Sequence, residues 1–387
     1  MKFFESLIYG GGLSRIISKP NIDWWLLGAV VPLLAAGLTT MNSFTGEGKF
    51  FEHQLVWIGL AFLVMFFLAF NDFRFLRRTS VIVTLFIGIV FLLLALFAVG
   101  STFKGAQSWF DIGGFSFQPS DLAKLVLILL LAKYFSRRHI EIANIRHILV
   151  SGFYAMVLFL LVLFQPDFGG AIVIFLIWLG MVLVSGISKK HLALVFVIGA
   201  IAFGGLWTSV FKEYQKQRIL TFIHPLTDIQ GAGYNAYQST IAVGSGGLLG
   251  KGIGYGTQSK LKFLPEYQTD FIFAAFAEEW GFVGVVLLLI LFGIVIWRVL
   301  ANAIRGATNF EVLYCVGVAI LFTSHFIIHV GMNIGLLPVT GLTMPFLSYG
   351  GTHLVIEFTA LGILFGMRRY QRASHKDEIK NEFIGPN

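Results

Sequence analysis

Residues 80–99 read SVIVTLFIGIVFLLLALFAV and contain no charged side chain. A helix needs about 20 mostly apolar residues to cross the ~30 Å hydrocarbon core of a bilayer. The sequence therefore predicts an all-α polytopic membrane protein with about ten transmembrane helices, in which residues 1–387 form a single membrane domain. The predicted helices lie near residues 24–41, 53–70, 80–99, 119–135, 148–165, 169–186, 192–211, 271–297, 312–331 and 351–367. The two stretches beside Pro166 can form either two helices with a tight turn or one broken helix.

The composition agrees with a bilayer as the main solvent. Hydrophobic residues make up 57% of the 387 residues and charged residues only 12%. Soluble domains carry about 25% charged residues, so most of this surface is not built for water. The single cysteine, Cys315, excludes an intramolecular disulfide.

Lys and Arg residues are divided unevenly between the two ends of the predicted helices. If both termini share one side, that side carries groups such as Arg74, Arg77 and Arg78, whereas the short loops opposite carry only Lys49 and Lys104. Cytoplasmic loops are the ones enriched in Lys and Arg. We therefore expect the N-terminus, residues 1–20, and the tail, residues 368–387, to be cytoplasmic. The net charge of +8 then reflects membrane topology, and no nucleic-acid partner is expected.

Residues 212–270 form the longest polar stretch and lie between the seventh and eighth predicted helices, on the outer side. Long loops cross the membrane regardless of their Lys and Arg content, so this loop does not disturb the topology. Its many glycines, among aromatic and apolar residues, favour ordered turns over disorder. The loop is either merely solvated or the place of chemistry on the outer face.

Charged and histidine side chains occur inside predicted helices, where they are expensive and usually functional. Asp121 and Lys124 are three residues apart, so they share a helix face and can form either a structural ion pair or part of a site. His325 and His329 also share a face. For these histidines, as for His353 and Glu357 in the last helix, polar contacts between helices are favoured over a metal site, because no third ligand has suitable spacing.

Four acids follow one another at the start of the eighth predicted helix. They are Glu266, Asp270, Glu278 and Glu279. Asp270 is either a simple helix N-cap or a carboxylate at the outer membrane boundary that can accept a proton, since partial burial raises a carboxyl pKa. Such a group of like charges favours raised pKa values or a bound cation.

Two further residues allow a purely structural interpretation beside a functional one. Asp167, before Phe168-Gly169-Gly170, is favoured as a helix N-cap. Trp109, in the loop after the third predicted helix, is either an interfacial tryptophan or a platform on which a sugar can stack.

Short motifs cover nearly the whole chain in order. They are Gln118-Pro119-Ser120-Asp121 with Lys124, Gln165-Pro166-Asp167-Phe168-Gly169, Tyr237-Gln238-Ser239 with Gly244-Ser245-Gly246-Gly247, Gly256-Thr257-Gln258-Ser259, Phe263-Leu264-Pro265-Glu266, Thr269-Asp270-Phe271-Ile272-Phe273-Ala274, Ala277-Glu278-Glu279, Leu337-Pro338-Val339-Thr340-Gly341 and Pro345-Phe346-Leu347-Ser348-Tyr349-Gly350-Gly351. In these motifs the chain strongly resembles the SEDS family, the bacterial shape, elongation, division and sporulation proteins.

Within the family the chain looks more like the elongation member RodA than the division member FtsW. The Gly-Thr-Gln-Ser stretch before Phe263 is the RodA-like form, whereas Thr340-Gly341-Leu342-Thr343 leans toward FtsW. Asp121 stands where many members have Glu, and Thr352-His353 where Ser-Ser is common. Neither departure touches the outer acidic motif.

The resemblance implies a ten-helix bundle in the bacterial cytoplasmic membrane that polymerises lipid II into glycan strands on the outer face. The reaction is an inverting glycosyl transfer, and the implied partner is a class B penicillin-binding protein. Asp270 matches the catalytic aspartate, and Lys124 matches a functional lysine that would contact the substrate diphosphate or hold the bundle together through Asp121. The remaining predicted substrate-binding residues are Trp109, Arg218, Gln238, Ser239, Lys251, Glu266 and Ser348.

Cations stabilise a diphosphate leaving group as it gains charge. Arg218 and Lys251 are candidates for that role, together with a divalent ion, Mg²⁺ or Mn²⁺, held by Glu266 or Asp270.

Two other function classes stay open on the sequence. A lipid II flippase would need alternating access, often built from inverted repeats; Pro166 and Pro338 are compatible with broken helices, but no repeat is visible. A non-catalytic scaffold for a penicillin-binding protein would tolerate the loss of Asp270, whereas a polymerase would not.

Overall fold

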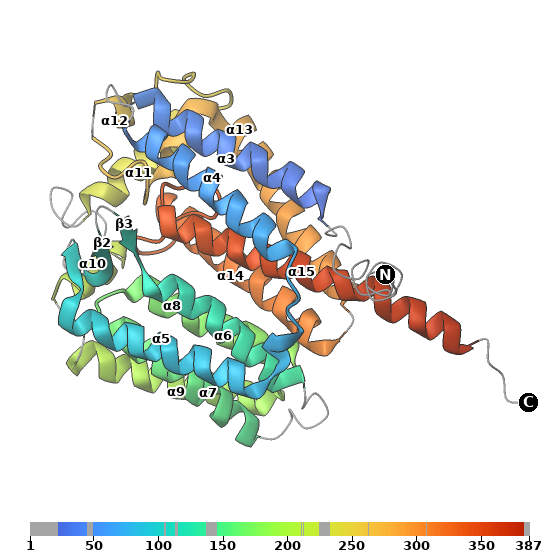
Figure 1. The fold of residues 1–387 in the computed structure, drawn as a ribbon. Coiled ribbons are helices and arrows are strands. Elements are labelled where there is room, and N and C mark those ends of the chain that lie inside the picture. The colour runs from blue at the N-terminus through green and yellow to red at the C-terminus, as the bar shows by residue number, and fades with distance from the viewer. Residues whose placement is uncertain are drawn as a thin grey trace, which may run out of the picture.

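A computed structural model describes residues 22–44, 49–103, 106–112, 115–136, 145–209, 211, 213–223, 233–261, 263–306 and 308–382 (Figure 1). A helix occupies each of the ten predicted ranges. These helices are α3 (Trp24–Phe44), α4 (Lys49–Ala69), α5 (Thr79–Val99), α6 (Pro119–Ser136), α7 (Ile145–Phe164), α8 (Phe168–Val184), α9 (Lys189–Ser209), α13 (Ile272–Ile304), α14 (Asn309–Asn333) and α15 (Gly351–Glu382).

Seven of these helices are long and apolar enough to cross a membrane, within the part of the chain that the structure describes: α3, α4, α5, α7, α9, α13 and α14. Helix α8 is apolar but shorter, and α6 carries Asp121, Lys124 and Lys133. The protein is therefore a polytopic helical membrane protein, and ten crossings stay a prediction.

The surface of the bundle is apolar where a soluble protein would be charged. Ile87 and Phe91 of α5 are exposed, and α9 has no buried residue. Large exposed apolar surfaces of this kind suit contact with lipid. Helix α6 is the opposite case, because most of its side chains are buried between α5, α8 and α14. Helix α6, with its charged residues, is thus shielded from lipid.

The chain makes a tight turn at Pro166. Helix α7 ends at Phe164, α8 begins at Phe168, and the two helices pack together. The Asp167 carboxylate accepts a hydrogen bond from the Gly170 amide at 2.8 Å. Two separate helices, with Asp167 as the N-cap of the second, are therefore confirmed.

The all-α prediction needs one correction. The segment between α5 and α6 forms a small antiparallel sheet of strands β1 (Ser101–Phe103), β2 (Ala106–Ile112) and β3 (Phe115–Phe117), in that order. The sequence prediction rested on membrane-length helices, which short strands between two spans do not disturb. Such strands satisfy their backbone groups by pairing with one another.

The long predicted loop contains short helices. They lie together with the sheet at one end of the bundle (Figure 1). They are α10 (Glu213–Ile223), α11 (Tyr234–Ser245) and α12 (Thr257–Lys260). The ordered loop predicted from its glycines is present over these described residues.

At the opposite end of the bundle, a buried aspartate contacts both α13 and α15. Asp23, just before α3, accepts hydrogen bonds from Arg298 of α13 (Nη2, 2.7 Å) and Asn302 (Nδ2, 3.1 Å), and it also pairs with Arg368 of α15 at 3.3 Å. Burial raises the pKa of Asp23, but Arg298, Asn302 and Arg368 outweigh it and hold this pKa below its ordinary value. The start of α3 and the late part of α15 therefore lie on the same side.

Helix α13 is kinked at Gly281, where φ is +64°. A Cβ at this position would lie 2.2 Å from the Gly250 amide nitrogen, so only glycine fits. The freed amides of Phe282 and Val283 donate to the carbonyls of Gly247 and Leu248, at 2.9 and 3.1 Å. The kink thus lets the backbone of Gly247 and Leu248 pack against α13 and accept hydrogen bonds from it.

Candidate active site

Asp270 lies at a tight corner of the chain, which we call the Asp270 corner and define as residues 264–271. The Glu266 carbonyl accepts hydrogen bonds from the amides of Thr269, Asp270 and Phe271, at 3.1 to 3.2 Å. Glu266 adopts a φ of +54°, a conformation that costs energy for a residue with a Cβ. Asp270 itself is partly exposed, and the N-cap position of α13 belongs to Phe271. The backbone is thus fixed around a carboxylate that stays accessible.

Asn333, the last residue of α14, joins three elements at this corner. Its Nδ2 donates to the Asp270 carbonyl at 3.0 Å, and its Oδ1 accepts from the Ala274 amide at 3.2 Å. Ser239 of α11 donates from Oγ to the Asn333 carbonyl at 2.8 Å. The predicted residue Ser239 is buried and supports Asp270 through Asn333, a residue that sequence reasoning missed.

A second contact of the corner is with the connecting segment, which we define as residues 334–350 between α14 and α15. Ser348 Oγ donates to the Thr269 carbonyl at 2.8 Å, and the Tyr349 amide donates to the Gln268 carbonyl at 2.8 Å. A Cβ added to Gly341 would lie 3.6 Å from Asp270 Oδ2, so the backbone of this glycine faces the carboxylate. The structure thus brings the predicted residue Ser348 to the Asp270 corner, where it bonds to backbone.

Two tyrosines border the same region. Burial raises the pKa of both Tyr267 and Tyr349 above the ordinary tyrosine value. Both phenols therefore stay protonated near pH 7 and can act as hydrogen-bond donors.

The four predicted acids divide into two pairs. Glu266 and Asp270 are partly exposed, whereas Glu278 and Glu279 are fully buried. Glu278 pairs with Lys251 Nζ at 2.7 Å and accepts from Thr257 Oγ1 at 3.0 Å. Glu279 accepts from the Gly254 amide at 2.6 Å. The second pair therefore holds residues 251–257 against α13. Lys251, a predicted diphosphate ligand, is paired with Glu278.

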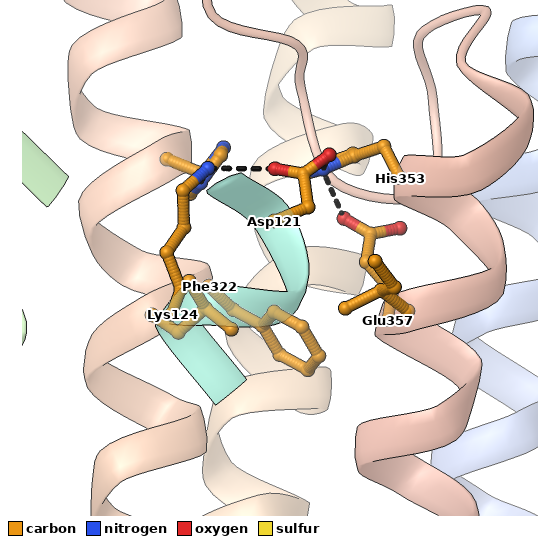
Figure 2. A pocket seen from close by; sticks show the side chains of 8 residues that line it. Asp121, Lys124, Phe322, His353 and Glu357 are labelled. Carbon is orange, nitrogen blue, oxygen red and sulfur yellow. Dashed lines mark hydrogen bonds and ion pairs between the residues drawn. The ribbon is translucent and has the colours of Figure 1, made fainter. Parts of the chain in front are cut away.

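A second group of ionisable side chains lies inside the bundle, and we call it the buried cluster (Figure 2). Lys124 Nζ donates to Asp121 Oδ1 at 2.7 Å and lies 3.2 Å from His325 Nε2. His353 places Nδ1 3.2 Å from Asp121 Oδ2 and Nε2 3.0 Å from Glu357 Oε1. These five residues line a cavity with only about 10 Å³ for the centre of a water molecule. Because Lys124 is 2% exposed, this arrangement supports its structural alternative.

The remaining predicted site residues lie at the end of the bundle that carries the sheet and the short helices α10 to α12. Trp109 is partly buried in β2, and Gln238 is partly buried in α11 beside Ser239. Arg218 belongs to α10, but its side chain lies outside the described part of the structure.

Across the described residues, no group of three His, Cys, Asp or Glu side chains is arranged to hold a metal ion. His325 and His329 instead place their Nδ1 atoms 3.2 and 2.7 Å from the carbonyls of Thr343 and Leu342. A magnesium site made by Glu266 or Asp270 together with waters and the phosphates of a substrate stays a prediction.

Comparison with known proteins places this arrangement in a family. The family model described as a cell cycle protein, that of FtsW, RodA and SpoVE, matches residues 20–373. The chain is 34% identical to the stage V sporulation protein E of Bacillus subtilis over 347 residues, 89% of this chain and 94% of that protein. It is 38% identical to the peptidoglycan glycosyltransferase MrdB of Escherichia coli over 295 residues, 76% of this chain and 79% of that protein.

A solved structure has the same fold. It is a chain of a peptidoglycan synthase complex described as coordinating polymerization and crosslinking. The TM-score is 0.77 at 31% sequence identity, over 90% of this chain and 98% of that chain. With the match of the family model over most of its length, the chain belongs to the SEDS family of FtsW, RodA and SpoVE cell cycle proteins.

Proposed function

We propose that this protein is a peptidoglycan glycosyltransferase that polymerises lipid II into glycan strands. The relatives MrdB and several FtsW proteins carry the name peptidoglycan glycosyltransferase. The observation that carries the proposal is the Asp270 corner: a partly exposed carboxylate on a rigid backbone, at the end of a membrane bundle where the loops gather. A lipid-linked sugar substrate requires such a place, because its tail stays in the bilayer while its sugars lie outside.

The chemistry assigned to the corner is an inverting displacement. The 4-hydroxyl oxygen of the acceptor sugar attacks the anomeric carbon of the donor, the bond from that carbon to the diphosphate oxygen breaks, and Asp270 takes the hydroxyl proton. A positioned base of this kind contributes about 10² to 10⁴ in rate. The partial exposure of Asp270 allows a hydroxyl to reach it, and the hydrogen bonds of its amide and carbonyl fix the backbone that carries the carboxylate.

The leaving diphosphate requires positive charge. Arg218 is the candidate among side chains, because Lys251 is engaged by Glu278. A Mg²⁺ or Mn²⁺ ion, when bound, would neutralise the diphosphate oxygens. Glu266 and Asp270 would hold it, and both carboxylates lie in the same tight turn.

We assign the Asp270 corner to the outer face of the bacterial cytoplasmic membrane, with ten helices crossing it. The contacts of Asp23, just before α3, with Arg298 of α13 and Arg368 in the late part of α15 support this topology. The side on which these contacts lie also carries Arg74, Arg77 and Arg78, as the positive-inside rule requires of the cytoplasmic face.

The partner we propose is a class B penicillin-binding protein that cross-links the new strands. The supporting comparison is the peptidoglycan synthase complex, which is described as coordinating polymerization and crosslinking. We place the activity in cell elongation, as for RodA. The RodA-like stretch Gly256-Thr257-Gln258-Ser259 supports this, whereas the overall identity is the same, 38%, for MrdB and for an FtsW relative.

The test is glycan polymerisation from purified lipid II by the protein with its cognate penicillin-binding protein, whose own active site is disabled. Wild type should make polymer, whereas Asp270→Ala and Asp270→Asn should lose at least about a hundredfold in rate. Both variants must bind the partner and melt like wild type. Variants that polymerise normally would leave Asp270 a structural residue. An inactive wild type would favour the flippase or the scaffold, which a lipid II translocation assay separates.

A further inference from the structure

The connecting segment lies between the buried cluster and the Asp270 corner, and it is neither helix nor strand. Leu342, Met344, Phe346 and Leu347 of this segment are buried. Irregular backbone within a membrane protein is stable only where other groups satisfy its amides and carbonyls. The partners of this segment therefore decide its position.

Two of these partners belong to the buried cluster. Glu357 Oε2 accepts a hydrogen bond from the Phe346 amide at 3.1 Å, and His325 Nδ1 lies 3.2 Å from the Thr343 carbonyl. Phe346 has a φ of +61°, which is unfavourable for a bulky residue and persists only where its surroundings impose it. Its ring is held between Phe322 and Phe358, and its amide is held by Glu357.

His353 in turn forms an ion-pair contact with Glu357. Its imidazole lies between Glu357 Oε1 and Asp121 Oδ2, at 3.0 and 3.2 Å. Both contacts are favourable together only when both ring nitrogens carry a proton. Glu357 thus uses one oxygen for the histidine and the other for the Phe346 amide, and Asp121 of α6 anchors the arrangement.

The far side of the connecting segment contacts the Asp270 corner. Two residues after Phe346, Ser348 bonds to the Thr269 carbonyl and accepts from the Met344 amide, both at 2.8 Å. Gly341, two residues before Thr343, faces the Asp270 carboxylate. A displacement of residues 342–346 therefore moves Gly341 and Ser348, two residues through which the connecting segment contacts the Asp270 corner.

We propose that Glu357 and His353 are positioning residues for Asp270, acting through residues 342–349 of the connecting segment. The proposal rests on the proposed function. It assigns to the buried cluster a role in the reaction that needs no contact with substrate. For this role, the negative charge of Glu357 matters less than the ability of its side-chain oxygen to accept a hydrogen bond from the Phe346 amide.

The test compares Glu357→Leu, Glu357→Gln and His353→Gln with a matched control, Glu311→Gln. Glu311 is also buried and ion-paired, with Arg77, but it lies at the other end of α14, where it caps the helix with Thr308. Each protein is reconstituted in lipid nanodiscs with the disabled penicillin-binding protein. Amide hydrogen exchange of peptides spanning residues 342–349 is measured alongside kcat and KM for lipid II.

Glu357→Leu should raise exchange over residues 342–349 and lower kcat, each at least about tenfold, because a hydrogen bond to a charged acceptor is lost. KM should stay within about twofold, since no substrate contact is lost. Glu357→Gln keeps an oxygen for the Phe346 amide and should retain most of the activity. His353→Gln should fall between these two variants, and it decides the matter if Glu357→Leu does not fold. Glu311→Gln should match wild type in both measurements.

Unchanged exchange in Glu357→Leu and His353→Gln would overturn the proposal, as would an equal loss of kcat in Glu311→Gln. A wild type that makes no polymer would overturn the proposed function instead. Exchange would still decide, in that case, whether Glu357 holds the connecting segment.

Discussion

The buried cluster and the Asp270 corner both bring acidic side chains together from distant parts of the chain, but they expose them differently. In the buried cluster, Asp121 and Glu357 are almost completely buried and face Lys124 and His353. At the corner, the hydrogen bonds bind the backbone around Asp270, and its carboxylate remains partly exposed. A group that reacts must be reached by substrate, whereas a buried charge needs permanent partners.

The comparison predicts that changes of the Asp121–Lys124 pair in the buried cluster act mainly on stability. Changes at the corner are expected to act mainly on activity. The largest loss of stability is expected for Lys124→Met, which leaves Asp121 without its ammonium partner. Breaking a buried ion pair from one side costs about 3 to 5 kcal/mol. The measurement is the free energy of unfolding in a fixed lipid or detergent. The double variant Asp121→Leu with Lys124→Met should recover part of the loss, and a single variant as stable as wild type would contradict the distinction.

An intermediate loss is expected for Asn333→Leu, which removes the partner of the Asp270 carbonyl and the Ala274 amide. Unsatisfied buried polar groups cost about 1 to 3 kcal/mol. The matched control is Asn302→Leu, which removes a buried amide bonded to Asp23 at the opposite end. Both variants should melt earlier, but only Asn333→Leu should lower kcat in the polymerisation assay. Equal kcat values would show that Asn333 does not support the site.

The smallest effect on stability is expected for Asp270→Asn. Substitutions at accessible positions usually change the free energy of unfolding by less than about 0.5 kcal/mol, and Asp270 is partly exposed. The isosteric change Asp121→Asn, inside the buried cluster, should lower the melting temperature clearly. If Asp270→Asn were the less stable of the two, Asp270 would be a structural residue and the comparison would fail.

Sequence reasoning located every long helix among the residues that the structure describes. The length of a membrane helix is set by the thickness of the bilayer and can be read from a single segment. It also found the Asp167 cap, which is a contact across three residues. It missed the sheet of β1 to β3, because short strands between spans leave no signal of membrane length. It missed Asn333 as well, since one amide at the end of an apolar helix has no distinguishing pattern.

The candidate site was only half predictable. Asp270, Glu266, Ser239 and Ser348 were singled out from motifs, and the structure places them around one corner. Lys251 was predicted to contact a diphosphate, but it pairs with the buried Glu278, 27 residues further along the chain. Nothing in the local sequence distinguishes a lysine that is free for a ligand from one that neutralises a buried acid.

The membrane environment of this protein and the place of its helices follow from the sequence alone, because both depend on local apolarity. The distribution of Lys and Arg predicts which side of the membrane is cytoplasmic. The tertiary structure decided which charges are engaged with one another. Lys124 meets His325 from 201 residues away, and Arg298 meets Asp23 from 275 residues away. Burial makes such contacts obligatory, since an unpaired charge is too costly inside the bundle, but only the packing of the helices selects the partner.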